Sequence, residues 1–202
     1  MPLSFAHVFS WPYASMLCVG LLCGSCAVSA ASAAPLLLDD RSSANLCANN
    51  ASCWRLVTDG VMGGVSDGRL LPTQIDGRPC LRLTGQVSTL NNGGFIQASL
   101  DLDAAGLLDA RTYRGIEIEV IGNDETYNLH LRTADTRIVW QSYRTSFQAP
   151  AHWQTVRLPF AEMQPHRIEK PLDLSRLRRL GLVAIGREMQ ADLCISRLSF
   201  YP

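Results

Sequence analysis

The sequence predicts an all-β protein built as a β-sandwich of the jelly-roll kind. Three observations lead to this fold class. Short runs in which apolar and polar residues alternate recur along most of the chain. Clusters of Gly, Pro and Asn separate these runs, and almost no segment has the apolar spacing of a helix. Many short strands divided by turns are typical of two packed sheets.

The expected strands follow one another at short intervals. They cover residues 81–84, 94–100, 116–121, 127–132, 137–143, 153–158, 180–185 and 192–200. Alternation with a period of two is typical of an antiparallel strand that buries one face and exposes the other. Residues 172–180 have a helical pattern, so a short helix is predicted there.

Length and charge limit the possible functions. A chain of 202 residues with 47% hydrophobic content can bury one core but is short for two domains. Its 18 basic residues equal its 18 acidic residues, so no field of one sign would attract nucleic acid or an anionic membrane. We expect neither as a direct partner, and membrane contact only through an uncleaved N-terminus or a partner in a membrane complex.

The N-terminal segment differs from the rest of the chain. No Lys, Arg, Asp or Glu precedes Asp39, the apolar run 16–23 is followed by small residues, and 31–33 read Ala-Ser-Ala. These features predict a cleavable export signal over residues 1–34 and a periplasmic or secreted protein. A membrane anchor over 16–38 and a lipoprotein modified at Cys26 are the alternatives. A lead-in over 35–53 and one β-sandwich domain over 54–202 would follow.

Four cysteines remain after removal of the signal, and they are Cys47, Cys53, Cys80 and Cys194. An even number in an oxidising compartment permits two disulfides. Cys47 and Cys53 are close in sequence and are the favoured pair. Cys80 and Cys194 lie in predicted strands and can pair only if those strands are neighbours. A zinc site would need closely spaced ligand pairs, and none occurs, so we expect no metal.

Two glycine-rich motifs stand out from the strand pattern. They are WRLVTDGVMGGVSDG over residues 54–68 and GQVSTLNNGGF over residues 85–95. Together with YRGI at 113–116, GNDETY at 122–127 and WQTVRLPF at 153–160, they make the chain resemble the complex I intermediate-associated protein 30 family. The resemblance covers nearly all of the chain after the predicted signal. It implies a fold similar to galactose-binding jelly rolls.

The sequence departs from the family pattern at one position. The family usually has Glu immediately before the Asn-Asn-Gly-Gly stretch, whereas this chain has Leu90. Any role that needs a carboxylate at this position is therefore not expected here.

The candidate binding residues lie in the two motifs, and they are Asp59, Met62, Gly63, Gly64, Ser66, Asn91, Asn92, Gly93 and Gly94. Small oxygen-bearing residues on loops of a rigid sandwich could bind a ligand. The structural alternative is a bend that packs Val61, Met62 and Val65 against the core. In that bend Asp59 and Ser66 would bond backbone amides, and residues 91–94 would form a tight hairpin turn. Calcium is conceivable at such oxygens, but no calcium-loop spacing is present.

Aromatic side chains offer a second kind of site. Trp54, Trp140, Tyr143 and Trp153 could stack on a sugar ring, although large aromatics are more often core residues. Trp140 and Tyr143 are three residues apart, so on one strand they would face opposite sides.

The resemblance implies a non-catalytic binding or assembly factor, chaperone-like in the assembly of a membrane complex. The chain contains no Gly-x-Ser-x-Gly or His-Glu-x-x-His motif, and its histidines are isolated in sequence. We expect no catalytic residues and no cofactor. A protein partner is the first expectation. The alternative is a carbohydrate- or small-ligand-binding jelly-roll module in the cell envelope, with a glycan as partner.

Overall fold

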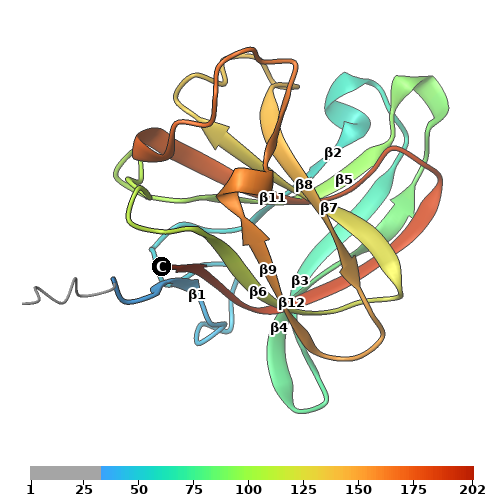
Figure 1. Cartoon of the computed structure of the whole chain (residues 1–202). Coiled ribbons are helices and arrows are strands. Elements are labelled where there is room, and N and C mark those ends of the chain that lie inside the picture. Colours follow the sequence, from blue (N-terminus) through green and yellow to red (C-terminus); the bar gives the residue numbers. More distant parts are fainter. Residues whose placement is uncertain (1–32) are drawn as a thin grey trace, which may run out of the picture. The chain divides into compact units, whose positions relative to one another are not determined.

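Two antiparallel sheets pack face to face, which confirms the predicted all-β sandwich (Figure 1). The computed structural model describes residues 33–202. One sheet has the order β3 (Asp67–Ile75), β4 (Arg78–Val87), β12 (Met189–Tyr201), β6 (Gly115–Ile121) and β9 (Gln154–Pro159), with β1 (Leu36–Asp39) also paired to β12. The other has the order β10 (Gln164–His166), β8 (Ser142–Ala149), β7 (Glu125–Thr133), β11 (Leu177–Ile185), β5 (Phe95–Asp101) and β2 (Arg55–Thr58). They are named the β12 sheet and the β7 sheet.

Alternate residues of the strands form the core between the sheets. In β6, Ile116, Ile118 and Val120 are fully buried, whereas the intervening Glu117 pairs with exposed Arg157 at 2.7 Å. The same alternation buries Leu129 and Leu131 in β7 and Leu180 and Leu182 in β11. Each such side chain contributes about 1.5–3 kcal/mol by leaving water. The period-two pattern of the sequence is thus the pattern of burial.

Two predicted elements are wrong. Residues 172–180 contain only the 3₁₀ turn η4 (Leu174–Arg176), after which β11 begins. Asp173 caps this turn by accepting a hydrogen bond from Ser175 N at 3.0 Å, and extended backbone at Leu177 then starts the strand. The strand expected over 137–143 begins only at Ser142, because residues 134–141 form a loop.

The predicted hairpin turn at residues 91–94 is also wrong. The strands on either side, β4 and β5, belong to different sheets. The chain crosses between the sheets through the 3₁₀ turn η2 (Leu90–Asn92). Asn91 and Asn92 have φ values of 56° and 59°, a left-handed conformation that Asn tolerates well.

The favoured Cys47–Cys53 disulfide is present, and so is the Cys80–Cys194 disulfide, which the sequence left open. Cys47 and Cys53 are bonded with their Cα atoms 3.8 Å apart. Cys80 and Cys194 are bonded with a Cα separation of 5.6 Å, because β4 and β12 are neighbouring strands as their pairing requires. Two disulfides indicate a protein of an oxidising compartment outside the cytoplasm.

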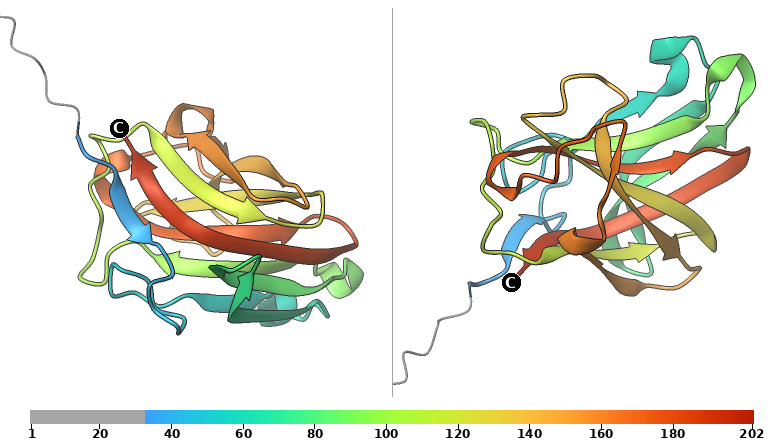
Figure 2. Two further views of the ribbon diagram at one scale, coloured as in Figure 1. Left: turned by 90° about the horizontal axis from the view of Figure 1, so that it is seen from below. Right: turned by 45° about the horizontal axis from the view of Figure 1, so that its top comes forward.

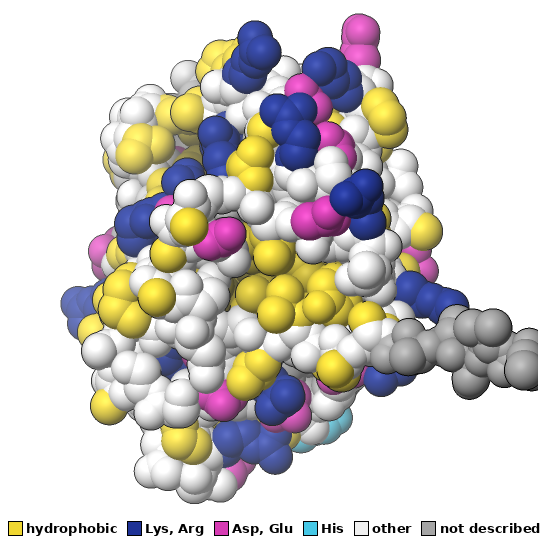
Figure 3. All heavy atoms as spheres, turned by 90° about the vertical axis from the view of Figure 1, so that its left-hand side faces the viewer, with side chains coloured by type: hydrophobic (Ala, Val, Ile, Leu, Met, Phe, Trp, Pro, Cys, Tyr) yellow, Lys and Arg dark blue, Asp and Glu magenta, His cyan; other side chains and the backbone are white. Residues whose placement is uncertain are grey.

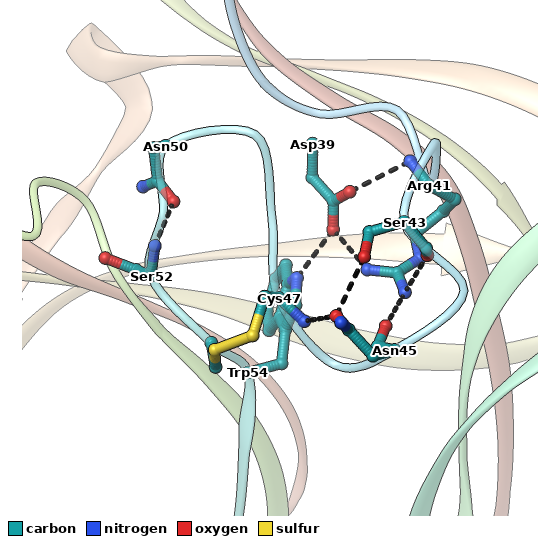
Figure 4. The surroundings of a disulfide bond; sticks show 9 residues. Asp39, Arg41, Ser43, Asn45, Cys47, Asn50, Ser52 and Trp54 are labelled. Atoms are coloured by element: carbon teal, nitrogen blue, oxygen red, sulfur yellow. Dashed lines mark hydrogen bonds and ion pairs between the residues drawn. A yellow bond between two sulfur atoms is a disulfide. The ribbon is translucent and has the colours of Figure 1, made fainter.

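Residues 35–53 are bound closely to the sandwich. β1 lies beside the C-terminal part of β12, as Figure 2 shows. Asp39 accepts hydrogen bonds from Trp54 Nε1 at 2.7 Å and from Arg41 Nη1 at 2.8 Å (Figure 4). The side chains of Asp39 and Arg41 are only 4% and 3% exposed. This buried ion pair and the Cys47–Cys53 bond hold the segment in one conformation.

The predicted export signal lies outside the described residues except for positions 33 and 34. Over residues 33–202, none of the helices has the length and apolar character needed to cross a membrane. Figure 3 shows one side of the molecule, where acidic and basic side chains are interspersed around a central group of hydrophobic ones. This mixture agrees with the balanced charge of the sequence.

Candidate functional site

Asp59 joins the two glycine-rich motifs. It begins the 3₁₀ turn η1 (Asp59–Met62) and is completely buried. Its carboxylate accepts hydrogen bonds from Gly94 N at 2.6 Å, Ser66 N at 3.0 Å and Phe95 N at 3.2 Å, and from Ser66 Oγ. Figure 1 shows η1 (teal) and η2 (green) side by side as a result. Residues 59–66 and 88–95 are named the Asp59 loop pair.

The pKa of Asp59 lies below its ordinary value. Burial alone would raise the pKa, but the hydrogen bonds from Gly94, Ser66 and Phe95 favour the ionised form and outweigh burial. Asp59 is therefore an ionised carboxylate held by neutral donors, as the structural alternative expected. No basic side chain bonds to it among the described residues.

Two glycines allow the loops to approach this carboxylate. A Cβ atom on Gly64 would lie 2.4 Å from Asp59 Cγ, and one on Gly93 would lie 2.5 Å from Asp59 Oδ2. No other residue type fits at either position without displacing Asp59. The glycines of the two motifs thus have a structural explanation, and a binding role for them stays a prediction.

The apolar side chains of residues 61–65 do not pack against the core, so the predicted packing of this bend is wrong. Val61, Met62 and Val65 are 74%, 52% and 52% exposed. The Asp59 side chain and its donors occupy the inside of the bend, so these side chains point outward. Leu90, which replaces the glutamate of the family pattern, is 66% exposed. The carboxylate of Glu188 instead accepts hydrogen bonds from Thr89 N and Oγ1 at 2.5 and 2.8 Å.

A cleft of about 380 Å³ lies on the outer face of the β7 sheet. Val61 and Met62 of η1 border it on one side, and Val139 and Trp140 of the loop between β7 and β8 border it on the other. Its floor is apolar near η1 and basic farther along the strands. The apolar end comprises Val57, Phe95, Val183 and Ile185, and the basic end comprises His130, Arg132, Arg144 and Arg179.

Strand register brings the floor residues together from distant parts of the sequence. Arg144 of β8 pairs with His130 of β7, which pairs with Gly181 of β11 and through it with Ser99 of β5. Directly paired residues of antiparallel strands lie on the same face. Since Gly181 has no side chain, the Gln97 amide covers it, and a Cβ there would lie 2.6 Å from Gln97 Nε2.

Residues 134–141 are named the Trp140 loop, and arginines hold its backbone. Arg132 Nη2 donates to Ile138 O at 2.9 Å, and Arg178 Nη2 donates to Thr136 O at 3.1 Å. Gln141 Oε1 accepts from Ile138 N at 3.2 Å. The side chains of residues 137–140 remain exposed, with Val139 69% and Trp140 49% exposed. The loop therefore presents an ordered apolar surface to the cleft.

Residues 43–195 match the family described as complex I intermediate-associated protein 30, and this match decides the family. The chain belongs to this family. Comparison with curated proteins gives no match. The matched residues include the Asp59 loop pair and the whole floor of the cleft.

Solved structures similar to this family member include carbohydrate-binding modules. The family 11 module from Clostridium thermocellum in complex with a β-1,3-1,4-mixed-linked tetrasaccharide has a TM-score of 0.64 and 11% identity, and the match covers 84% of this chain and 97% of the module. The family 11 module of the cellulosomal cellulase Lic26A-Cel5E from the same organism has a TM-score of 0.63 and 10% identity, and the match covers 83% of this chain and 94% of the module. A family 30 module has a TM-score of 0.52 and 18% identity, and the match covers 68% of this chain and 91% of the module. At these identities the likeness shows the jelly-roll fold.

The basic end of the cleft in this family member is partly dehydrated. Burial, followed by the charges of Arg144 and His166, lowers the pKa of His130 to about 3, so this imidazole is neutral at ordinary pH. His130 Nε2 is buried and has no hydrogen-bond partner among the described residues. Burial and the charge of Arg167 also lower the pKa of Arg144, although an arginine remains protonated.

Of the four aromatic candidates, Trp140 lines the cleft. Trp54 and Tyr143 are 2% and 1% exposed in the core. Trp153 lies on the β12 sheet side beneath the guanidinium of Arg78, which is 4.8 Å from its ring centroid.

Within residues 33–202 no group of three or more His, Cys, Asp or Glu is arranged to hold a metal. Sequence analysis named Met62 and Trp140 as binding candidates, but the floor residues His130, Arg132, Arg144 and Arg179 belong to no motif, and it missed them. Their signal was the alternation of polar residues such as His130 and Arg132 on predicted strands.

Proposed function

We propose that this family member is a non-catalytic binding protein that acts outside the cytoplasm and holds a segment of a protein partner in the cleft of the β7 sheet. The observation that supports this most is an ordered apolar rim on a rigid floor. Met62 and Trp140 face the cleft from opposite sides and are 52% and 49% exposed. Met, Trp and Arg are the residues enriched at protein interfaces.

The family gives the kind of partner. Its description is that of a protein associated with an assembly intermediate of a respiratory complex, so the proposed role here is chaperone-like, in the assembly of a membrane complex. We also propose that an export signal over residues 1–34 is cleaved, so that the mature protein begins with residues 35–53 as a lead-in to the domain 54–202. The intact mass of the exported chain tests the cleavage position, and an uncut chain in the membrane fraction contradicts it.

Site-specific photo-cross-linking tests the binding face. A photoreactive amino acid replaces Trp140, and in a matched control it replaces Leu71, which is 59% exposed on β3 of the opposite sheet. Irradiation in the native cell envelope should give a discrete protein adduct from position 140 and none from position 71. Equal adducts from both positions, or none from position 140, would contradict the proposed face.

A glycan is the second candidate, and one observation favours it. Trp140 stands at the edge of a cleft whose floor presents the Gln97 amide, and a flat ring beside hydrogen-bonding groups is a suitable sugar platform. The tetrasaccharide-bound family 11 module has the same fold. Calorimetry with mixed-linked β-glucan tetrasaccharide should detect no binding if the cleft takes a protein segment. Binding that Trp140→Ala abolishes would favour the glycan.

A further inference from the structure

The cleft has an excess of positive charge that the protein does not neutralise. Its lining includes Arg132, Arg144 and Arg179 but no Asp or Glu. Arg179 Nε pairs with Asp101 Oδ1 at 2.6 Å, so its charge is balanced. Arg132 uses its guanidinium on the carbonyl oxygens of the Trp140 loop at Thr136 and Ile138. These two arginines are therefore already committed to structural contacts.

Arg144 is different because, within residues 33–202, only the Nε–H of its guanidinium has a hydrogen-bond partner. Its Nε donates to Ser142 Oγ at 2.8 Å. None of the ion pairs within residues 33–202 includes Arg144. The ionisable groups that act on it or respond to it are His130, His166 and Arg167, all of them basic. A half-buried guanidinium on which no acidic group of residues 33–202 acts favours an anion as its partner.

Apolar residues line the cleft farther along the strands from this guanidinium. Beyond the Arg144–His130–Gly181 pairing, the next positions on the same face include Val183, which pairs with Gln97, and then Ile185, which pairs with Phe95. Successive residues on one face of a strand are separated by about 6.6 Å. Val183 is only 1% exposed, so the accessible apolar residue on this strand is Ile185, two such steps from Gly181. Because β7 lies between β8 and β11, Arg144 is also about 10 Å away across the sheet. An extended segment that crosses the cleft obliquely could place an acidic side chain at Arg144 and an apolar one, about four residues away, on Ile185.

The middle of the cleft offers groups for a peptide backbone. The Gln97 amide covers Gly181 and forms no hydrogen bond within the described residues. It can donate to a carbonyl oxygen and accept from an N–H of a bound segment. An amide between a cationic end and an apolar end suits an extended chain better than a featureless apolar ligand.

We infer that the cleft recognises an extended, acidic-apolar segment of the partner, in which the carboxylate of an Asp or Glu pairs with Arg144. An apolar residue about four positions away packs against Ile185 and Met62, and Trp140 covers the segment from the side. This inference rests on the proposed function and adds the chemistry of the partner. The fork of Arg144 favours a carboxylate because it can donate two parallel hydrogen bonds.

Selection from a phage-displayed library of random 12-residue peptides tests this inference. The exported chain is the bait, and the enriched peptides are synthesised and titrated against four proteins. These are the unmodified chain, Arg144→Gln, Arg69→Gln and Trp140→Ala. Arg69 is a matched control because it is exposed on β3 of the opposite sheet and has no ion pair within residues 33–202.

The expected result is enrichment of peptides with Asp or Glu about four positions from an apolar residue. Their affinity should fall about ten- to hundredfold with Arg144→Gln, as for loss of a charged hydrogen-bonded pair, and should not change with Arg69→Gln. The affinity should also weaken with salt in the unmodified chain, and less so in Arg144→Gln. Thermal unfolding of each variant shows that it is folded.

Three other results would overturn the inference in distinguishable ways. Peptides that bind through Trp140 but lack acidic residues and tolerate Arg144→Gln would refute it and leave the proposed function intact. Peptides indifferent to Trp140→Ala would refute both. Failure to enrich peptides, together with Arg144-dependent binding of tetragalacturonate, would replace the protein segment with an acidic glycan.

Discussion

The Asp59 loop pair and the Trp140 loop border the same cleft from opposite sides, yet they are stabilised by opposite means. In the first, a buried carboxylate collects backbone N–H groups. In the second, guanidinium groups of Arg132 and Arg178 collect backbone carbonyl oxygens. The carboxylate is fully enclosed, whereas both arginines are partly exposed. We therefore expect the first loop system to determine stability and the second to determine binding.

Removal of the Asp59 charge should have the largest effect. Asp59→Asn keeps the size of the side chain but cannot accept all the hydrogen bonds from Ser66, Gly94 and Phe95, so buried N–H groups lose their partner. Loss of several such bonds should lower the free energy of unfolding by about 3 kcal/mol. Urea denaturation measures this, with Asp67→Asn as an exposed neighbouring control. A change no larger than that of the control would contradict the role of Asp59.

Gly64→Ala should destabilise the same loop pair by about 1–3 kcal/mol, because the added methyl collides with Asp59 Cγ. Gly106→Ala is the matched control, since an added Cβ there meets no atom within 4 Å. Thermal unfolding compares the two variants. Equal melting temperatures would mean that the loops can separate without cost.

The Asp59 loop pair should also make stability depend on acid. The pKa of Asp59 is lowered in the folded chain, so the unfolded chain binds the proton more readily as the pH falls. Its contribution is complete above about pH 4, the ordinary pKa of Asp, and is lost as the pH falls through the lower folded value. Urea midpoints from pH 6 to pH 2 should decline less in Asp59→Asn than in the unmodified chain. Parallel declines would show that another carboxylate causes the acid sensitivity.

Sequence analysis predicted the first of these regions far better than the second. For the Asp59 loop pair it expected Asp59 and Ser66 to bond backbone amides, but it did not expect the donors Gly94 and Phe95, which lie 35 and 36 residues from Asp59. Even there, the side on which Val61 and Met62 lie depended on the buried carboxylate filling the bend. The cleft depends on the register of several strands, which places Arg144 beside His130 and Gly181. Alternation predicts that such residues face outward but not which strands become neighbours.

Trp140→Ala should weaken binding more than stability, the opposite of what we expect for Asp59→Asn. The ring is half exposed, so its loss should change the free energy of unfolding by less than about 0.5 kcal/mol. Binding of the partner segment should weaken about tenfold or more, as expected for an aromatic anchor. Titration of a selected peptide and urea denaturation of the same sample measure both quantities. A large loss of stability with unchanged binding would reverse the assignment of the two loops.

Arg178 allows the most delicate test, because it supports the Trp140 loop without lining the cleft. Arg178→Gln removes the hydrogen bond to Thr136 O, so the loop should be less ordered before binding and the ordering cost should fall on the complex. We expect binding to weaken about two- to fivefold, since ordering a few side chains costs about 0.5–1.5 kcal/mol each. Arg178→Lys, which keeps a donor, should restore part of the affinity.

The loss of affinity in Arg178→Gln should lie mainly in the association rate, since an ordered loop is ready to bind. Unchanged kinetics in Arg178→Gln would mean that Arg132 and Gln141 suffice to hold the loop, and that the carbonyl contacts of the two arginines are redundant.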